Sequence, residues 1–213
     1  MVTRPALQEE TLLELRPGWV MGLVGPLGYG LTGLGLAMLA TPSKVGLVAM
    51  LDVRGWLSPP AAWEYGIDPE RLVVVRCPDR RQWTAVTAAL LEGLPALYAE
   101  VPIGIHERDL RRLAALARAR RVALALRPLR GDLPEGVAHL RLRALGVDWG
   151  GVERGYGRLQ RRQVLLEVSG KGTGGMARQM TWVEDVGENT LRVVSRLATS
   201  WDEIPTRVGG AAG

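Results

Sequence analysis

The residues most able to do chemistry lie in a glycine-rich stretch, GPLGYGLT, which follows an uncharged apolar segment. Gly25, Gly30 and Thr32 fit the phosphate-loop pattern G-x-x-x-x-G-K-[ST], and Gly28 adds a further glycine to the loop. Glycines let backbone N–H groups face an anion, and a hydroxyl at the last position would contact Mg²⁺. Leu31 stands where the pattern has lysine, so the full positive charge that reaches the β- and γ-phosphates is missing.

These residues predict a degenerate phosphate loop, which keeps its shape but does not hold a nucleotide tightly. The alternative is a glycine-rich turn between a strand and a helix that binds no ligand at all. We expect no bound cofactor under either interpretation, because an apolar side chain at the mouth of the loop adds nothing that attracts a polyanion.

The surrounding segment Gly18–Pro42 contains no charged residue and is long enough to suggest a membrane span. Pro26 and the neighbouring glycines argue against that, because lipid cannot satisfy the backbone groups of a loop. We therefore predict a buried strand at Trp19–Val24, the loop, and a helix from Thr32 to Leu39. The N-terminus lacks the pattern of a signal peptide, so a cytoplasmic location is expected.

Metal binding is not expected from the cysteine and histidine content. Cys77 is the single cysteine, which rules out a cysteine cluster or an intramolecular disulfide. His106 and His139 are isolated from each other and lack the spacing of zinc ligands.

Strand and helix patterns alternate through the first 126 residues, which predicts an α/β fold with a parallel sheet covered on both faces. Further strands are expected towards the C-terminus, where an alternating segment begins an antiparallel extension. The expected strands are Val45–Leu51, Leu72–Val75, Ala96–Val101, Val122–Leu126 and Val137–Leu145, and the expected helices are Arg81–Glu92 and Glu107–Arg120.

The glycines in Gly146–Gly157 predict a break, after which Gln163–Ser169 and Gln179–Val183 form a hairpin. The expected organisation is an N-terminal helix or arm at 1–17, one domain at 18–186, and a C-terminal segment with a loose tail at 187–213.

Positive charge is concentrated in the second half of the chain. Residues 1–103 carry 8 basic and 10 acidic side chains, a net charge of −2, whereas residues 104–213 carry 19 basic and 12 acidic ones, a net charge of +7. This distribution suggests DNA contact, and a solvated arginine-coated surface is the alternative. The candidate DNA contacts are Arg111, Arg112, Arg118, Arg127, Arg130, Arg158, Arg161 and Arg162.

The order of the motifs resembles the RecA-like family over roughly residues 15–145. GPLGYGLT lies where that family has its Walker A loop, and the next strand ends in Asp52-Val53-Arg54. LSP, then YGID, then a strand and Pro78-Asp79 follow in the order found in the family. Ala96–Val101 resembles the Walker B strand. The resemblance implies a RecA-like core of mostly parallel strands flanked by helices.

The departures from the family pattern affect its chemistry. The resemblance places the phosphate-binding lysine at Leu31, the catalytic glutamate at Arg54 and the Walker B aspartate at Glu100. Arginine stays protonated and cannot act as a general base, and phosphoryl transfer depends on positioning and charge stabilisation. We therefore expect a chain that does not hydrolyse ATP and is not an enzyme.

Residues 56–79 most resemble the ImuA proteins of bacterial translesion-synthesis operons. The resemblance implies a non-catalytic adaptor in the SOS response to DNA damage. Its expected protein partners are an inactive Y-family polymerase homologue and an error-prone C-family polymerase, with weak DNA binding and self-association left open. Two alternatives remain: a division inhibitor similar to SulA, and a nucleotide-binding switch without hydrolysis.

Overall fold

Short apolar segments alternate with helices in the first half of the chain and form the parallel part of one sheet. The computed structural model describes residues 13–153, 156–185 and 190–194. The parallel strands are β1 (Val20–Val24), β2 (Val48–Asp52), β3 (Leu72–Arg76), β4 (Ala96–Val101) and β5 (Ala123–Pro128). β1, β2, β4 and β5 are buried along their whole length, which is the environment that continuous apolar runs predict.

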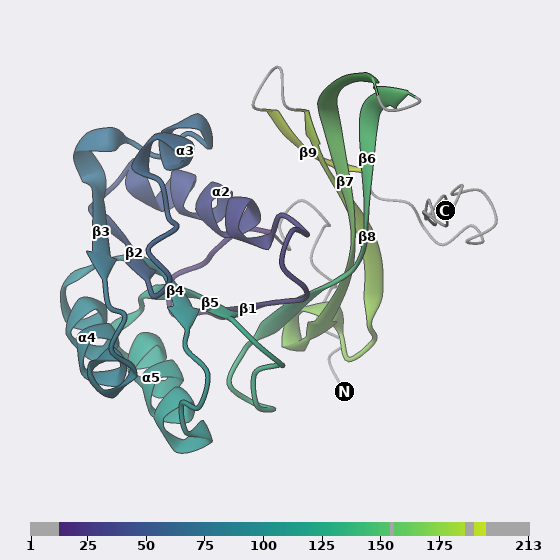
Figure 1. Ribbon diagram of the computed structural model, residues 1–213. Coiled ribbons are helices and arrows are strands. Elements are labelled where there is room, and N and C mark those ends of the chain that lie inside the picture. Colours follow the sequence, from purple (N-terminus) through teal and green to yellow (C-terminus); the bar gives the residue numbers. More distant parts are fainter. Residues whose placement is uncertain (1–12, 154–155, 186–189, 195–213) are drawn as a thin grey trace.

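Helices cover both faces of these strands (Figure 1). The helices α2 (Leu31–Ser43) and α3 (Pro59–Glu64) lie on one face, and α4 (Arg80–Gly93) and α5 (Glu107–Arg120) lie on the other. Pro59 occupies the first turn of α3, where its missing N–H costs nothing. The Asp79 carboxylate accepts a hydrogen bond from the N–H of Arg81 and caps α4. Arg121, with φ 57°, ends α5 in the left-handed conformation.

Two hydrophobic cores result, because successive strand residues face opposite sides of the sheet. On β1, Met21 packs into the core under α2, whereas Val20 packs into the core shared with α4 and α5. Tyr98 on β4 joins the first core, and Trp83 on α4 joins the second. The predicted parallel sheet with helices on both faces is confirmed.

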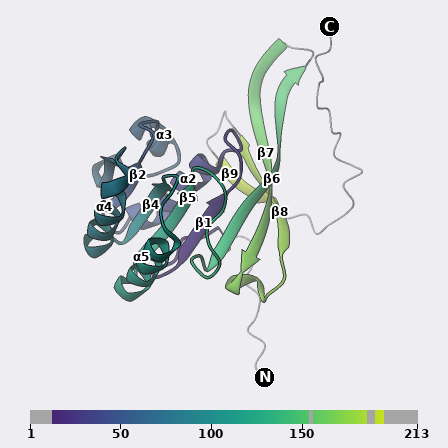
Figure 2. The same cartoon turned by 60° about the horizontal axis from the view of Figure 1, so that its bottom comes forward.

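The second half of the sheet consists of strands that, within the described residues, follow one another without α-helices between them. These are β6 (Leu140–Glu153), β7 (Tyr156–Gly170), β8 (Arg178–Asp185) and β9 (Thr190–Val194). Two short 3₁₀ helices complete the described elements: η1 (Pro69–Arg71) before β3 and η2 (Lys171–Thr173) after β7. Within the described residues, nine strands form one sheet in the order β3-β2-β4-β5-β1-β6-β7-β8-β9. In Figure 2 the strands β6 to β8 turn away from the helical layers, and the β6–β7 hairpin extends past the parallel strands.

Two expectations about this half are corrected. The segment expected at Val137–Leu145 to begin the antiparallel part instead pairs parallel with β1, and β6 becomes antiparallel only towards β7. The glycines of Gly146–Gly157 do not break the sheet. β6 continues through most of them with register shifts at Ala144/Gly146 and Gly150/Val152, since glycine readily accommodates a β-bulge.

The expected hairpin at Gln163–Ser169 and Gln179–Val183 is confirmed, as β7 pairs antiparallel with β8. Within the segment 187–213, Thr190–Val194 adds β9 to β8, and the remaining tail lies outside the described residues. The N-terminal helix or arm expected at 1–17 falls mostly outside them as well, and 13–17 are not helical.

Candidate functional site

The expected strand–loop–helix is present at the carboxyl end of β1. Gly25, Gly28 and Gly30 all have positive φ, at 151°, 84° and 73°, a backbone geometry that favours glycine. Gly30 is the N-cap of α2, and no side chain caps the helix there. The helix begins at Leu31 and runs to Ser43, four residues further than the pattern predicts.

Leu31 fills the base of this loop instead of projecting from it. Its side chain is only 1% exposed and belongs to the core between the sheet and α2. A Cβ added to Gly25 would lie 3.1 Å from the Leu31 Cδ1 and 2.9 Å from the Ala144 Cβ. The side chain at the lysine position is therefore packed inward against β6, and it offers no charge or hydrogen bond to a phosphate.

Thr32 lies in the first turn of α2 and is half-buried, with its side chain close to the Tyr98 phenol. Burial is the main cause that raises the pKa of the Tyr98 phenol, and Glu100 adds to the shift; the Thr32 hydroxyl opposes it. The hydroxyl that would contact Mg²⁺ in a phosphate loop thus lies near the Tyr98 phenol.

Arg127 lies beneath the loop, and its expected role as an exposed DNA contact is corrected. The side chain is almost fully buried at the carboxyl end of β5. Its guanidinium donates hydrogen bonds to the carbonyl oxygens of Leu23 (3.3 Å), Gly25 (3.1 Å) and Pro26 (3.3 Å). Burial lowers its pKa. Arg127 holds the phosphate-loop backbone from below, so it is not available to a phosphate at the surface.

The two positions expected to carry catalytic carboxylates form an ion pair with each other. Glu100, fully buried at the end of β4, accepts hydrogen bonds from the backbone N–H groups of Val53 (3.0 Å) and Arg54 (3.2 Å). The Arg54 Nε donates to the second carboxylate oxygen at 2.9 Å, and its Nη2 completes the ion pair. Trp56 covers the other side of the guanidinium, with the Arg54 Cζ 4.5 Å from the ring centroid.

Asp52 has a structural role in the same loop. It is fully buried, and its two carboxylate oxygens accept hydrogen bonds from the N–H groups of Gly55 (2.8 Å), Trp56 (3.2 Å) and Leu57 (3.1 Å). These three bonds fix the loop after β2 and so orient Arg54 towards Glu100.

A second charged cluster lies against the N-terminus of α2, and the sequence reasoning missed its arrangement. A Cβ added to Gly30 would lie 2.5 Å from the Arg162 Cζ, so this guanidinium from β7 contacts the first residue of the helix. Arg162 forms an ion pair with Glu184, whose other oxygen accepts a hydrogen bond from the Tyr65 hydroxyl. Trp149 and Trp182 lie on the guanidinium, at 5.2 and 5.5 Å from its Cζ.

The register of the hairpin explains this cluster. Trp149, Arg162 and Glu184 are direct partners across β6, β7 and β8, and Trp182 shares a face with Glu184. The register shift at Gly150/Val152 lies between the β6–β7 turn and the Trp149–Arg162 pair, so placing the turn alone does not predict that pair. The contact with α2 depends in addition on how the sheet curves.

The remaining candidate DNA contacts do not gather at one place. Arg112 and Arg130 are exposed near the carboxyl ends of the parallel strands, whereas Arg118 lies at the opposite end of α5. Arg111 is ion-paired with Glu107. Arg161 is exposed on β7 and has an interaction of its own, and the side chain of Arg158 lies outside the described residues.

In the described part of the chain, no group of three or more His, Cys, Asp and Glu side chains is arranged to hold a metal ion. None of the described helices has the length and apolar character needed to cross a membrane.

The sequence around this site matches one protein-family model. The model of the MT3502 N-terminal domain matches residues 11–131, more than half of the chain. This chain belongs to the MT3502 N-terminal domain family. The match includes the phosphate loop, Arg54, Glu100 and Arg127, whereas Arg162 and Glu184 lie beyond it.

A structural comparison places the fold of this family member among RecA-like proteins. The crystal structure of the RadB recombinase is similar with a TM-score of 0.58 and 17% sequence identity, covering 85% of this chain and 93% of that chain. The RecA-like fold expected from the order of motifs is therefore confirmed. No curated protein matches the sequence.

Proposed function

We propose that this chain is a non-catalytic RecA-like protein that acts by binding other proteins. The ion pair between Arg54 and Glu100 carries the proposal. Both residues stand where the RecA-like pattern has carboxylates that serve catalysis, and here one has become a cation that neutralises the other. This ion pair holds the loop in place, and neither position then offers a free carboxylate that could activate water or bind a metal ion.

Three groups that ATP hydrolysis needs are missing from this site: a general base, a carboxylate free to bind Mg²⁺, and a lysine. Arg54 cannot accept a proton from an attacking water. Each Glu100 oxygen already accepts two hydrogen bonds, so Mg²⁺ coordination would require breaking the ion pair. Leu31 is packed in the core, and no lysine neutralises charge on the transferred phosphoryl group. The protein is expected not to be an enzyme.

The finer form of the proposal is an adaptor in DNA repair and SOS translesion synthesis. It rests on the resemblance of residues 56–79 to ImuA proteins. Its protein partners would be an inactive Y-family polymerase homologue and an error-prone C-family polymerase in the cytoplasm. The RecA-like fold supports a connection with DNA repair only in general terms, through the similarity to a recombinase.

Two assays test the absence of hydrolysis. Purified protein with Mg²⁺-ATP, in the presence and absence of single-stranded DNA, should release no phosphate above background. The same assay on the double variant Leu31→Lys/Arg54→Glu shows whether the scaffold would support hydrolysis with these groups restored. ATP turnover by the unmodified protein at an ordinary enzymatic rate, about 1 s⁻¹ or faster, would overturn the proposal.

A pull-down of the tagged protein from its native host after DNA damage tests the adaptor role. Recovery of Y-family and C-family polymerases supports translesion synthesis. Recovery of the division machinery, together with filamentous cells on overproduction without DNA damage, would instead favour the alternative of a division inhibitor similar to SulA.

One observation favours nucleotide binding without hydrolysis as a second candidate. The backbone N–H groups at the start of α2 remain, and Arg162 brings a guanidinium to Gly30. Calorimetric titration with Mg²⁺-ATP separates the two functions. No saturable binding up to about 1 mM, a weak affinity of about −4 kcal/mol, would discard the switch.

A further inference from the structure

The loops at the carboxyl ends of the parallel strands form one continuous edge of the molecule. The Glu100 carboxylate binds Arg54 in the loop after β2, and the Val101 carbonyl accepts a hydrogen bond from the Leu129 N–H (3.1 Å) in the loop after β5. Arg80, which begins α4 after β3, lies directly against Gly104 in the loop after β4. Arg127 connects the end of β5 to the loop after β1 through its bonds to carbonyl oxygens.

Three large apolar side chains on this edge point into solvent. Trp56 after β2 is 68% exposed, Leu27 after β1 is 59% exposed, and Ile103 after β4 is 61% exposed. Tryptophan is rarely this accessible in a folded protein, and apolar side chains grouped on one surface mark an interaction site. Arg54 stacks on Trp56 and braces that ring.

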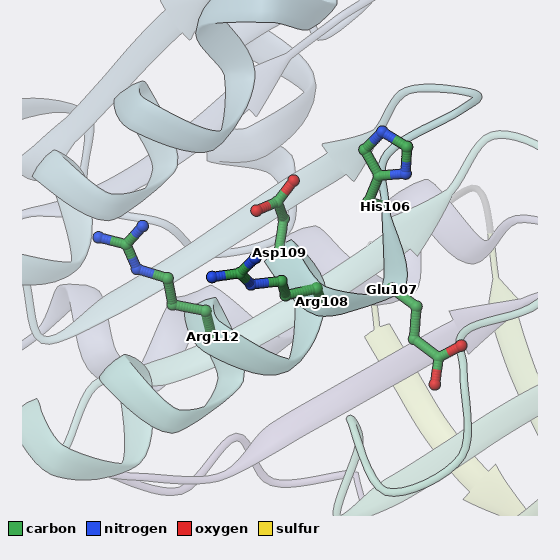
Figure 3. A pocket seen from close by; sticks show the side chains of 5 residues that line it. All are labelled: His106, Glu107, Arg108, Asp109 and Arg112. Carbon is green, nitrogen blue, oxygen red and sulfur yellow. The ribbon is translucent and has the colours of Figure 1, made fainter.

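Four exposed arginines lie on the segments that follow the same strands, at the start of α4, in the first half of α5 and after β5. None forms an ion pair with the described residues. They are Arg80, Arg108, Arg112 and Arg130. Figure 3 shows a pocket at the start of α5, where the guanidinium groups of Arg108 and Arg112 extend to one side and the Glu107 carboxylate points to the other.

Most acidic side chains near this edge are already engaged. Glu100 pairs with Arg54, Glu107 pairs with Arg111, and Asp132 pairs with Arg141 and Arg143. Asp109 lines the pocket beside Arg108 and is half-buried, and the exposed Asp79 caps α4 beside Arg80, so these two carboxylates face four arginines. The edge is therefore apolar with a surplus of positive charge.

We infer that this edge is a docking surface for an acidic segment of a partner protein that carries large apolar side chains. Charge complementarity with the four arginines selects an anionic partner. Leu27 and Ile103 are aliphatic and offer no ring for base stacking, which favours a protein segment over single-stranded nucleic acid. Trp56 is the expected anchor, since tryptophan and arginine are enriched among residues that dominate binding energy. The inference rests on the proposed function, because it names the chemistry of the partner that a non-catalytic adaptor would bind.

Selection of a random peptide display library against the full chain tests the surface without knowledge of the partner. The selected peptides should be rich in Asp and Glu with interspersed Leu, Ile or aromatic residues. Binding of one such synthetic peptide should weaken at least tenfold in Trp56→Ala, in Ile103→Asp and in Arg112→Glu, and it should weaken as salt is added.

Matched control residues lie at the other ends of the parallel strands, where the strands begin. Val45 is 82% exposed between α2 and β2, and Arg118 lies near the C-terminus of α5. Val45→Asp and Arg118→Glu should leave peptide affinity unchanged, and circular dichroism should show every variant folded.

Any of three results would contradict the proposed docking surface: no enriched peptides, selected peptides without acidic bias, or a peptide affinity that neither Trp56→Ala nor Ile103→Asp changes. An oligothymidine that binds more tightly than the selected peptide and depends on the same residues would assign the edge to nucleic acid. These outcomes are separate from the ATP assays, whose failure would remove the proposed function and leave peptide binding measurable.

Discussion

The guanidinium of Arg162 lies against Gly30, the N-cap residue of α2, although Gly30 follows β1 and Arg162 lies on β7, with β6 between these two strands. A cation is unfavourable at the N-terminus of a helix, because the helix dipole places partial positive charge there. The ion pair with Glu184 and the rings of Trp149 and Trp182 offset that repulsion. The cluster thereby joins the phosphate loop to the antiparallel strands.

Gly30→Ala should destabilise the protein more than Gly28→Ala. Both positions have positive φ, which an alanine adopts at a cost of about 1 kcal/mol. Only the Cβ at Gly30 would also collide with Arg162, since nothing lies within 4 Å of a Cβ at Gly28. Urea unfolding should show the difference, and adding Arg162→Ala should reduce it. Equal losses for the two glycines would contradict the contact.

Removing one partner of the Arg54–Glu100 ion pair should be costly. Glu100→Ala leaves two backbone N–H groups and a largely buried guanidinium without their acceptor, which should lower the free energy of unfolding by about 3–5 kcal/mol. A double-mutant cycle with Arg54→Ala and Glu100→Ala measures the coupling. The double variant should lose less than the sum of the single losses, and strict additivity would show that the pair does not interact.

Tyr65→Phe removes the hydrogen bond from the phenol to Glu184. We expect a loss of about 1–2 kcal/mol in the free energy of unfolding, because the acceptor is charged and half-buried. Tyr29→Phe is the matched control, since the Tyr29 hydroxyl makes no hydrogen bond with the part of the chain that the structure describes, and the change should be near zero. Burial, followed by Glu184, raises the pKa of Tyr65, so its absorbance should titrate well above that of a free tyrosine.

His139 should make stability depend on pH below neutrality. Its Nδ1 accepts a hydrogen bond from the N–H of Val20 (3.0 Å), and the ring stacks on Trp19. Burial lowers the pKa of His139, and Arg118 and Lys171 lower it further. The neutral form is therefore favoured in the folded state, and its contribution is complete above the unfolded pKa of about 6.5. It is lost as the pH falls from there towards the folded pKa, because the unfolded chain binds more protons.

Unfolding measurements at pH 7.5 and 5.5 check this dependence. The variant His139→Asn keeps an acceptor for the Val20 N–H but does not titrate, so its stability should fall less between the two pH values. An equal fall in both proteins would assign the dependence to other groups.

Local patterns in the sequence determined the elements around the loop. Continuous apolar runs predicted β1, β2, β4 and β5, and the helix at Glu107–Arg120 followed from its apolar spacing. The glycines at 25, 28 and 30 predicted a loop because their conformations favour glycine wherever the rest of the chain lies. The resemblance in motif order also placed Arg54 and Glu100 at related positions in the fold.

The tertiary structure alone decided what the side chains do at those positions. Arg54 and Glu100 meet because β2 and β4 are neighbours, and Arg127 is buried because β5 lies beside β1. The parallel pairing of β6 with β1 also escaped prediction, since alternation marks a half-covered strand but not its direction. Periodicity along a chain records which faces are apolar, whereas contacts between distant strands depend on sheet order and register, which no local pattern contains.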